Sequence, residues 1–185
     1  MKIIAFAGMP FSGKTEAVKI AKDMGIPVIR MGNMVWEEVK NRGLEINDNN
    51  VGNIANQMRK HFGKDIWAKK TIQKLKSLDE IKTLVIDGVR NIEEIDAFKK
   101  ELGEDFMVVA VEVGDELRFK RALNRDRDDD ITDIKKIKER DQRELSWGLD
   151  VVIASADVII SNEGSINEFQ RRVKEVLQKN MKTIT

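Results

Sequence analysis

The stretch Gly8-Met9-Pro10-Phe11-Ser12-Gly13-Lys14-Thr15 follows an apolar run, Ile3–Ala7, and precedes a segment with helical periodicity. It fits the pattern G-x-x-x-x-G-K-[ST], whose glycines let the backbone curl so that successive N–H groups converge on phosphate oxygens. The helix that follows adds the positive end of its dipole at the same point. The sequence therefore predicts that Gly8–Thr15 bind the phosphates of a nucleotide, which we expect to be ATP.

Two side chains of this loop have specific chemical roles in the pattern. Lys14 is expected to reach the β- and γ-phosphates and to act in catalysis, and the hydroxyl of Thr15 is expected to bind Mg²⁺. Phosphate binding alone does not identify a reaction, because loops of this kind also serve switches, motors and nucleic-acid machines. The chain has no Asn-Lys-x-Asp segment, which argues against a switch GTPase.

Apolar runs alternate with helix-period segments along the chain, which is typical of strands and crossover helices in a parallel sheet. Five strands are expected, at Ile3–Ala7, Pro27–Ile29, Thr83–Asp87, Phe106–Val113 and Val158–Ile160. With helices on both faces, they predict a three-layer α/β protein, and the pattern of Gly8–Thr15 resembles that of P-loop NTPases, which implies their fold.

Two segments do not follow this alternation. Residues 31–78 contain no convincing strand and are expected to form three helices, which would be an insertion on the sheet. Residues 118–143 are dense in Arg, Lys and Asp. Elsewhere, Asn91 with Glu94 and Ser165 with Glu168 predict capping boxes that open two helices.

The composition limits the number of domains and the kinds of partner. The 185 residues amount to about 1.2 typical domains, so we expect one domain over residues 1–185. The formal net charge is +1, so no overall field attracts nucleic acid or an anionic membrane. The chain has no cysteine and one histidine, which excludes disulfides and zinc sites built on Cys or His. No apolar run approaches the roughly 18 residues that span a bilayer, and we expect a cytoplasmic protein.

The third expected strand ends in Asp87-Gly88-Val89-Arg90. In this the chain resembles the nucleoside monophosphate kinases, adenylate kinase especially, and above all an adenylate-kinase-related archaeal group, whose third strand ends in Asp-Gly followed shortly by Arg. The resemblance implies that Asp87 orients Mg²⁺ beside the loop and that Arg90 grips the phosphate of an acceptor. The alternative is an aspartate that merely ends a strand.

The lid of these kinases carries Arg-x-x-x-Arg and then Arg-x-Asp-Asp. Here Arg121-Ala122-Leu123-Asn124-Arg125 is followed by Arg127-Asp128-Asp129-Asp130. The resemblance implies a short lid over residues 115–130, with Arg121, Arg125 and Arg127 converging on the transferred phosphoryl group. Arg140 or Lys138 could add another cation. A solvated, charged helix end is the alternative.

The acceptor side departs from the adenylate kinase pattern. Where those kinases have Thr-Gly-Asp-x-x-Arg, this chain has Met31-Gly32-Asn33-Met34-Val35-Trp36, so the acceptor need not be AMP. Residues 31–78 are expected to bind the acceptor. Three arginines are candidates for holding its phosphate in place of the missing one: Arg30, Arg42 and Arg59.

Several aromatic and sulfur-containing side chains of this segment have two interpretations. Trp36 and Trp67 could stack on a base, although tryptophans in helices more often belong to the core. The methionines Met31, Met34 and Met58 could line an adaptable pocket, although core packing is the simpler expectation.

The segment Asp157–Ser165 is similar to the last strand and loop of dephospho-coenzyme A kinases, in which an Asn-x-Gly loop lies against adenine. The resemblance implies that Asn162 and Gly164 contribute to ATP binding, and a plain strand-to-helix turn is the alternative. One other cluster, Arg140-Asp141-Gln142-Arg143-Glu144 with Trp147, matches no motif, and ion pairs on a helix surface are expected to account for it.

Taken together, the resemblance implies an ATP- and Mg²⁺-dependent kinase that transfers the γ-phosphoryl group to a nucleotide or nucleotide-like phosphorylated acceptor. The alternative is an ATP-binding regulator that hydrolyses slowly and acts through a macromolecular partner. The altered acceptor segment and the lack of a large lid domain favour this alternative. The oligomeric state stays open.

Overall fold

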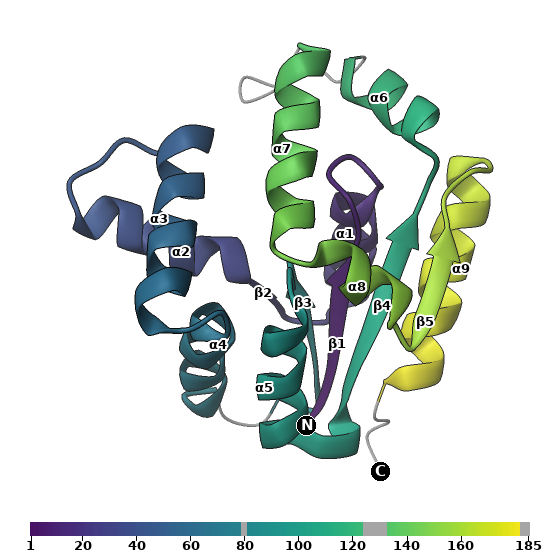
Figure 1. Cartoon of the computed structure of the whole chain (residues 1–185). Coiled ribbons are helices and arrows are strands. Elements are labelled where there is room, and N and C mark those ends of the chain that lie inside the picture. Colours follow the sequence, from purple (N-terminus) through teal and green to yellow (C-terminus); the bar gives the residue numbers. More distant parts are fainter. Residues whose placement is uncertain (79–80, 124–132, 182–185) are drawn as a thin grey trace.

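The computed structural model describes residues 1–78, 81–123 and 133–181. Five parallel strands form one sheet in the order β2-β3-β1-β4-β5 (Figure 1). They span Lys2–Ala7 (β1), Val28–Arg30 (β2), Thr83–Asp87 (β3), Phe106–Glu112 (β4) and Val158–Ser161 (β5). The predicted α/β fold with a five-stranded parallel sheet is confirmed, and no strand end differs from its predicted position by more than one residue.

Helices cover both faces of the sheet, which explains why the strands read as nearly continuous apolar runs. On β1, Ile4 and Phe6 face α1 (Lys14–Asp23) and α9 (Ile166–Asn180). Ile3 and its alternate neighbours face α5 (Ile92–Leu102) and α8 (Leu149–Ala154) on the other side. Figure 1 shows α5 and α8 in front of the sheet, with α1 behind it. A short 3₁₀ turn, Gly103–Asp105, leads from α5 into β4.

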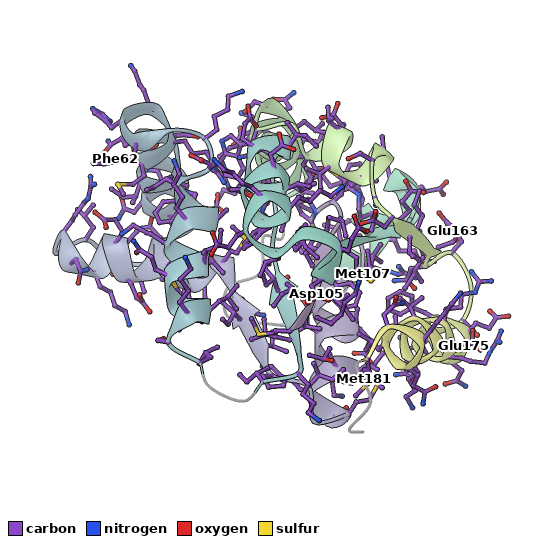
Figure 2. The ribbon with its side chains drawn as sticks, turned by 90° about the horizontal axis from the view of Figure 1, so that it is seen from below. Phe62, Asp105, Met107, Glu163, Glu175 and Met181 are labelled. Carbon is purple, nitrogen blue, oxygen red and sulfur yellow. The ribbon has the colours of Figure 1, made fainter. Side chains whose placement is uncertain are left out.

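The three helices expected within residues 31–78 are present beside the β2 edge (Figure 1). They are α2 (Met31–Asn41), α3 (Asp48–Phe62) and α4 (Ile66–Lys76). Trp67 is 1% exposed and packs in the core, so the idea that it stacks on a ligand base is wrong. The three methionines also belong to this core: Met31, Met34 and Met58. Figure 2 shows Phe62, at the end of α3, on the side of the molecule opposite Glu175 on α9.

Above the carboxyl edge of the sheet stand α6 (Asp115–Leu123) and α7 (Ile134–Ser146), as Figure 1 shows. The predicted lid over residues 115–130 therefore begins with α6, and its remainder, 124–130, lies outside the described residues. Gly148, at φ +98°, turns the chain from α7 into α8. None of the helices that the structure describes is both long and apolar enough to cross a bilayer.

The two predicted capping boxes have different outcomes. At α9 the box is complete, with the Ser165 hydroxyl and the Glu168 carboxylate exchanging hydrogen bonds with each other's backbone N–H. At α5 only half of it forms: the Asn91 side chain accepts from the Glu94 N–H at 2.8 Å, but the Glu94 carboxylate turns to Arg59 and to the N–H of Arg90. The predicted box at α5 was wrong because the Glu94 carboxylate pairs with the guanidinium of Arg59, a stronger electrostatic partner than the backbone N–H of Asn91.

Loss of the complete box should weaken α9 without touching the rest of the carboxyl edge. We expect Ser165→Ala to lower the free energy of unfolding by about 1 kcal/mol, because the backbone N–H of Glu168 loses the hydroxyl that accepts from it. Urea denaturation followed by circular dichroism measures the change. Ser77→Ala, at the exposed end of α4, is the matched control and should stay within about 0.5 kcal/mol of the unmodified protein. Equal losses in both variants would contradict the assignment.

Candidate nucleotide and acceptor site

The loop between β1 and α1 has a backbone that only glycine allows at two places. Gly8 and Gly13 lie at φ +145° and +110°. A Cβ on Gly8 would lie 2.5 Å from the carbonyl oxygen of Val111, and one on Gly13 would lie 2.2 Å from Nδ2 of Asn162. Phe11, at φ +63°, is the one non-glycine residue in the described part of the chain with a positive φ. The loop is thus tightly curled and packed against β4 and the loop after β5.

Lys14 begins α1 and folds back over the loop. Its ammonium donates to the carbonyl oxygens of Gly8 and, at 2.9 Å, of Met9. Burial, and after it the nearby guanidinium of Arg90, lower the pKa of Lys14 from 10.5 to about 8. The ammonium therefore stays mostly charged at pH 7. Its hydrogen bonds are made to two carbonyl oxygens of the loop itself.

Thr15 and Asp87 lie on neighbouring elements at the carboxyl edge. Asp87 ends β3 and pairs in register with Phe6, two residues before the loop, and its carboxylate accepts from Arg30 at 3.2 Å. A hydroxyl and a carboxylate are hard oxygen donors, which suit Mg²⁺ bound mainly through phosphates and water. The described residues contain no group of three or more His, Cys, Asp or Glu side chains that could hold a metal ion by themselves.

One cleft of about 480 Å³ joins most of the predicted site residues. Trp36, 40% exposed, lies in its wall. The predicted residues that line it come from the loop, the acceptor segment, the end of β3 and α6: Pro10, Phe11, Gly13, Lys14, Thr15, Arg30, Trp36, Asp87, Arg90 and Arg121. The remaining described candidates lie outside its lining: Gly8, Met9, Ser12, Arg59, Asn162 and Gly164.

Asn162 connects the loop after β5 to the loop Gly8–Thr15, here called the nucleotide loop. Its Nδ2 donates to the carbonyl of Ser12 at 2.8 Å, and its own carbonyl accepts from Arg121 at 2.8 Å. Gly164 sits inside the cap of α9, where a Cβ would lie 2.5 Å from Glu168 Oε2. In this structure Asn162 therefore stabilises the nucleotide loop through Ser12. Its role beside the adenine base of ATP stays a prediction.

The lid arginines are only partly placed. Arg121, on α6, lines the cleft, whereas Arg125 and Arg127 lie outside the described residues. Arg118, one turn before Arg121, is 1% exposed and donates to the carbonyl of Pro10 at 3.0 Å and to both carboxylate oxygens of Asp141. It joins α6, α7 and the nucleotide loop, a role that the sequence did not suggest.

The cluster on α7 forms ion pairs, as expected, but its carboxylates Asp141 and Glu144 are buried, so the expectation that it lies on the helix surface was wrong. Arg140, Arg143, Glu144 and Trp147 follow the spacing i, i+3, i+4, i+7, which places them on one face of the helix. Glu144 is 2% exposed and accepts hydrogen bonds from Arg90 and, at 3.4 Å, from Arg140. The spacing was the signal in the sequence, and it was missed because these four residues are polar or amphipathic.

The charges around Glu144 favour its ionised form. Burial alone would raise its pKa, but the cations Arg90, Arg140 and Lys14 outweigh burial, and the pKa of Glu144 lies below its ordinary value of 4.5. The carboxylate thus balances three cations that converge on the cleft. A phosphate that enters the cleft meets these same cations.

The three arginine candidates for the acceptor are placed differently. Arg30 is exposed at the cleft and pairs with Asp87. Arg59 is buried and pairs with Glu94 at 3.1 Å. Arg42 pairs with Glu38 at 3.0 Å and with Gln57 at 3.1 Å and lines neither the cleft nor the smaller cavity beside it, so it is not a candidate.

Comparison with known proteins gives the family. A family model described as an AAA domain matches residues 7–138. A UPF0200 protein of Methanosarcina barkeri is 45% identical over 177 residues, which cover 96% of this chain and 95% of that protein. The chain belongs to the AAA-domain and UPF0200 families. It also matches a UPF0200/UPF0201 protein of Archaeoglobus fulgidus at 42% identity over its full length, and there it spans 57% of the relative.

Solved structures support the fold of this UPF0200 family member. TT1252 from Thermus thermophilus matches with a TM-score of 0.64 at 16% identity, and shikimate kinase from Aquifex aeolicus with 0.52 at 18%. Each match covers 96% of this chain and 97% of the other. At such identities the likeness concerns the fold alone, which is that of the P-loop kinases.

Replacing Glu144 should expose the electrostatic balance of the cleft. We expect Glu144→Gln to lower the free energy of unfolding at pH 7 by about 3 kcal/mol, because it leaves the partly buried guanidinium of Arg90 without its counter-charge. Since the pKa of Glu144 is lowered by folding, its contribution is present above the unfolded-state pKa and is lost as the pH falls through the folded-state pKa. The difference should therefore stay constant between pH 7 and pH 5 and shrink only at lower pH.

Urea denaturation at a series of pH values measures this difference. Glu175→Gln, which breaks an exposed i, i+4 pair with Arg171, is the control and should change stability by less than about 0.5 kcal/mol. If the Glu144 variant is as stable as the unmodified protein at pH 7, the claim that Glu144 stabilises the fold by neutralising the cations of the cleft is refuted.

Proposed function

We propose that this protein is an ATP- and Mg²⁺-dependent phosphotransferase that moves the γ-phosphoryl group to a nucleotide or nucleotide-like phosphorylated acceptor. The observation that supports it most is a cleft of about 480 Å³ that joins the nucleotide loop to Arg90 and to the acceptor segment around Trp36. Donor and acceptor phosphates can thus lie together, and phosphoryl transfer requires little more than positioning and charge stabilisation.

On the donor side, the loop N–H groups and Lys14 bind the β- and γ-phosphates of ATP. Lys14 exchanges the carbonyls of Gly8 and Met9 for phosphate oxygens, which are the stronger partners for a cation. Thr15 and Asp87 hold Mg²⁺. When bound, Mg²⁺ neutralises charge on the β- and γ-oxygens.

On the acceptor side, Arg90 grips the acceptor phosphate, and Arg30 lies at the cleft mouth as a second cation. Trp36 offers an exposed ring on which a base can stack. Arg121 extends from α6 toward the transferred group, and Arg125 and Arg127 are proposed to join it. Arg59 lines a smaller cavity that adjoins the cleft.

The chemical step needs no proton acceptor when the accepting group is an ionised phosphate. An acceptor oxygen forms a bond to the γ-phosphorus as the bond to the bridging β–γ oxygen breaks, and ADP leaves with that electron pair. Charge on the three equatorial oxygens is met by Lys14 and by the arginines around the cleft.

The assay uses ATP labelled in the γ-phosphate with a panel of nucleoside monophosphates and dephospho-coenzyme A. Label in an organic product supports the proposal. Label found only as inorganic phosphate overturns it and favours the slow ATPase that acts through a partner.

A substitution of Lys14 tests whether this lysine accelerates phosphoryl transfer. We expect Lys14→Ala to slow transfer by about 100-fold or more, because it removes a cation that faces the developing charge. Lys19→Ala, on the exposed side of the same helix, is the matched control and should keep the full rate. Circular dichroism melting curves check that both variants are folded. A Lys14 variant with the unmodified rate would refute the role of this lysine.

A further inference from the structure

A small cavity, here called the inner pocket, opens off the cleft between α3 and α7. Its volume is about 100 Å³. It shares part of its lining with the cleft, including Arg90, Arg140 and Glu144, so the two spaces adjoin at these residues. The wall that belongs to the inner pocket alone includes Asp48, Arg59, Glu94, Arg143 and Trp147.

Arg59 has hydrogen-bonding capacity that the protein leaves unused. Its side chain is 9% exposed, and one of its terminal nitrogens pairs with Glu94 at 3.1 Å. Its Nε and Nη1 are buried and have no hydrogen-bond partner in the part of the chain that the structure describes. A buried donor without a partner costs about 1–3 kcal/mol, so these groups are suited to a ligand that supplies acceptors.

The surroundings hold Arg59 in place for such a ligand. Its guanidinium lies 4.3 Å from the centre of the Trp147 ring, and Trp147 Nε1 donates to Asn56 Oδ1 at 2.6 Å. Arg143 makes two hydrogen bonds to Asp48, at 2.9 and 2.8 Å. These contacts join α7 to α3, so the pocket is formed before a ligand arrives and little ordering is required on binding.

The charge of the pocket favours an anion. Four guanidinium groups line it, against three carboxylates, which leaves one positive charge in excess. The lining cations are Arg59, Arg90, Arg140 and Arg143, and the carboxylates are Asp48, Glu94 and Glu144. Burial also raises the pKa of Glu94, although Arg59 and Arg90 oppose this shift, so protonation of Glu94 would add to the excess.

The size of the pocket restricts what it can hold. A cavity of about 150 Å³ holds a benzene ring, and the inner pocket is smaller. An oxyanion such as a phosphate or carboxylate group fits, whereas a nucleobase does not. A base would remain in the wider cleft beside Trp36.

We propose that the inner pocket binds a second oxyanion of the acceptor, separate from the group that receives the phosphoryl group, with Arg59 as its main donor. Arg90, at the junction of the two spaces, holds the receiving phosphate, and Arg59 lies beyond it. The acceptor is therefore a small molecule with two anionic groups. This inference rests on the proposed function, because it identifies the second group of the same acceptor.

The test uses inorganic phosphate and acetate as separate probes for the two kinds of oxyanion. In ¹⁵N-labelled protein, the Nε–H resonance of Arg59 is assigned by its loss in Arg59→Lys. We expect it to shift and saturate with one probe or with both. A shift with phosphate alone identifies a phosphate pocket, and a shift with acetate alone identifies a carboxylate pocket. No shift with either probe would overturn the proposal.

Calorimetry on variants measures affinity for the probe that binds. Arg59→Met and Trp147→Leu should weaken it at least tenfold, and Arg42→Met, in the neighbouring ion pair with Glu38, should change it less than twofold. If Arg59→Met binds as the unmodified protein does, the proposal fails. Should that variant not fold, the resonance of the unmodified protein still decides.

One further variant separates this proposal from the proposed function. Lys14→Ala should lose transfer yet keep the Arg59 shift, because the inner pocket lies apart from the nucleotide loop. A protein that shows the Arg59 shift but transfers no phosphoryl group to any acceptor would refute the proposed function alone. Loss of the shift in Lys14→Ala would show that the probe binds the loop and would overturn the inner pocket.

Discussion

The ion pair between Arg90 and the buried carboxylate of Glu144 is the constraint on which the cleft depends. Arg90 follows β3, and Glu144 lies on α7, so this pair connects the helix directly to the carboxyl edge of the sheet. A buried carboxylate is stable only when cations and donors surround it, and here the cations are the groups needed for phosphates. The carboxylate therefore makes it possible to collect Lys14, Arg90 and Arg140 in one place without uncompensated repulsion.

The same arrangement has a consequence for ligand binding. A phosphate entering the cleft adds negative charge beside Glu144, so the cations must be shared or the carboxylate must move. Because Arg90 contacts Glu144 through its side chain and Glu94 through its N–H, its backbone is anchored independently of the ion pair. Its guanidinium can thus change partners while the end of β3 stays in place. Such an exchange costs less than building a cationic site anew, since the positive charges are already positioned.

The parts of the molecule that were predictable from sequence are those whose physics is local. The strands, the glycines of the loop and the cap at Ser165 are each determined by residues a few positions apart. The inward face of α7 was missed because its partners are distant: Arg90 and Glu144 are separated by 54 residues, and Arg59 and Glu94 by 35. Periodicity of apolar residues predicts which face of a helix is buried, but this face is buried through ion pairs, which that periodicity does not detect.

Glu94 can form either a local capping interaction or a long-range ion pair, and in this structure it forms the ion pair. Three residues after Asn91, it has the position of a capping-box carboxylate, yet a cap is worth about 1 kcal/mol, whereas Arg59 would be a buried, unpaired charge without it. The larger penalty prevails, and the carboxylate bonds to Arg59 and to the N–H of Arg90, one residue before the cap. Two nitrogens of Arg59 have no hydrogen-bond partner among the described residues. The incomplete capping box at α5 thus lies beside these two nitrogens of Arg59, which we propose bind an oxyanion of the acceptor.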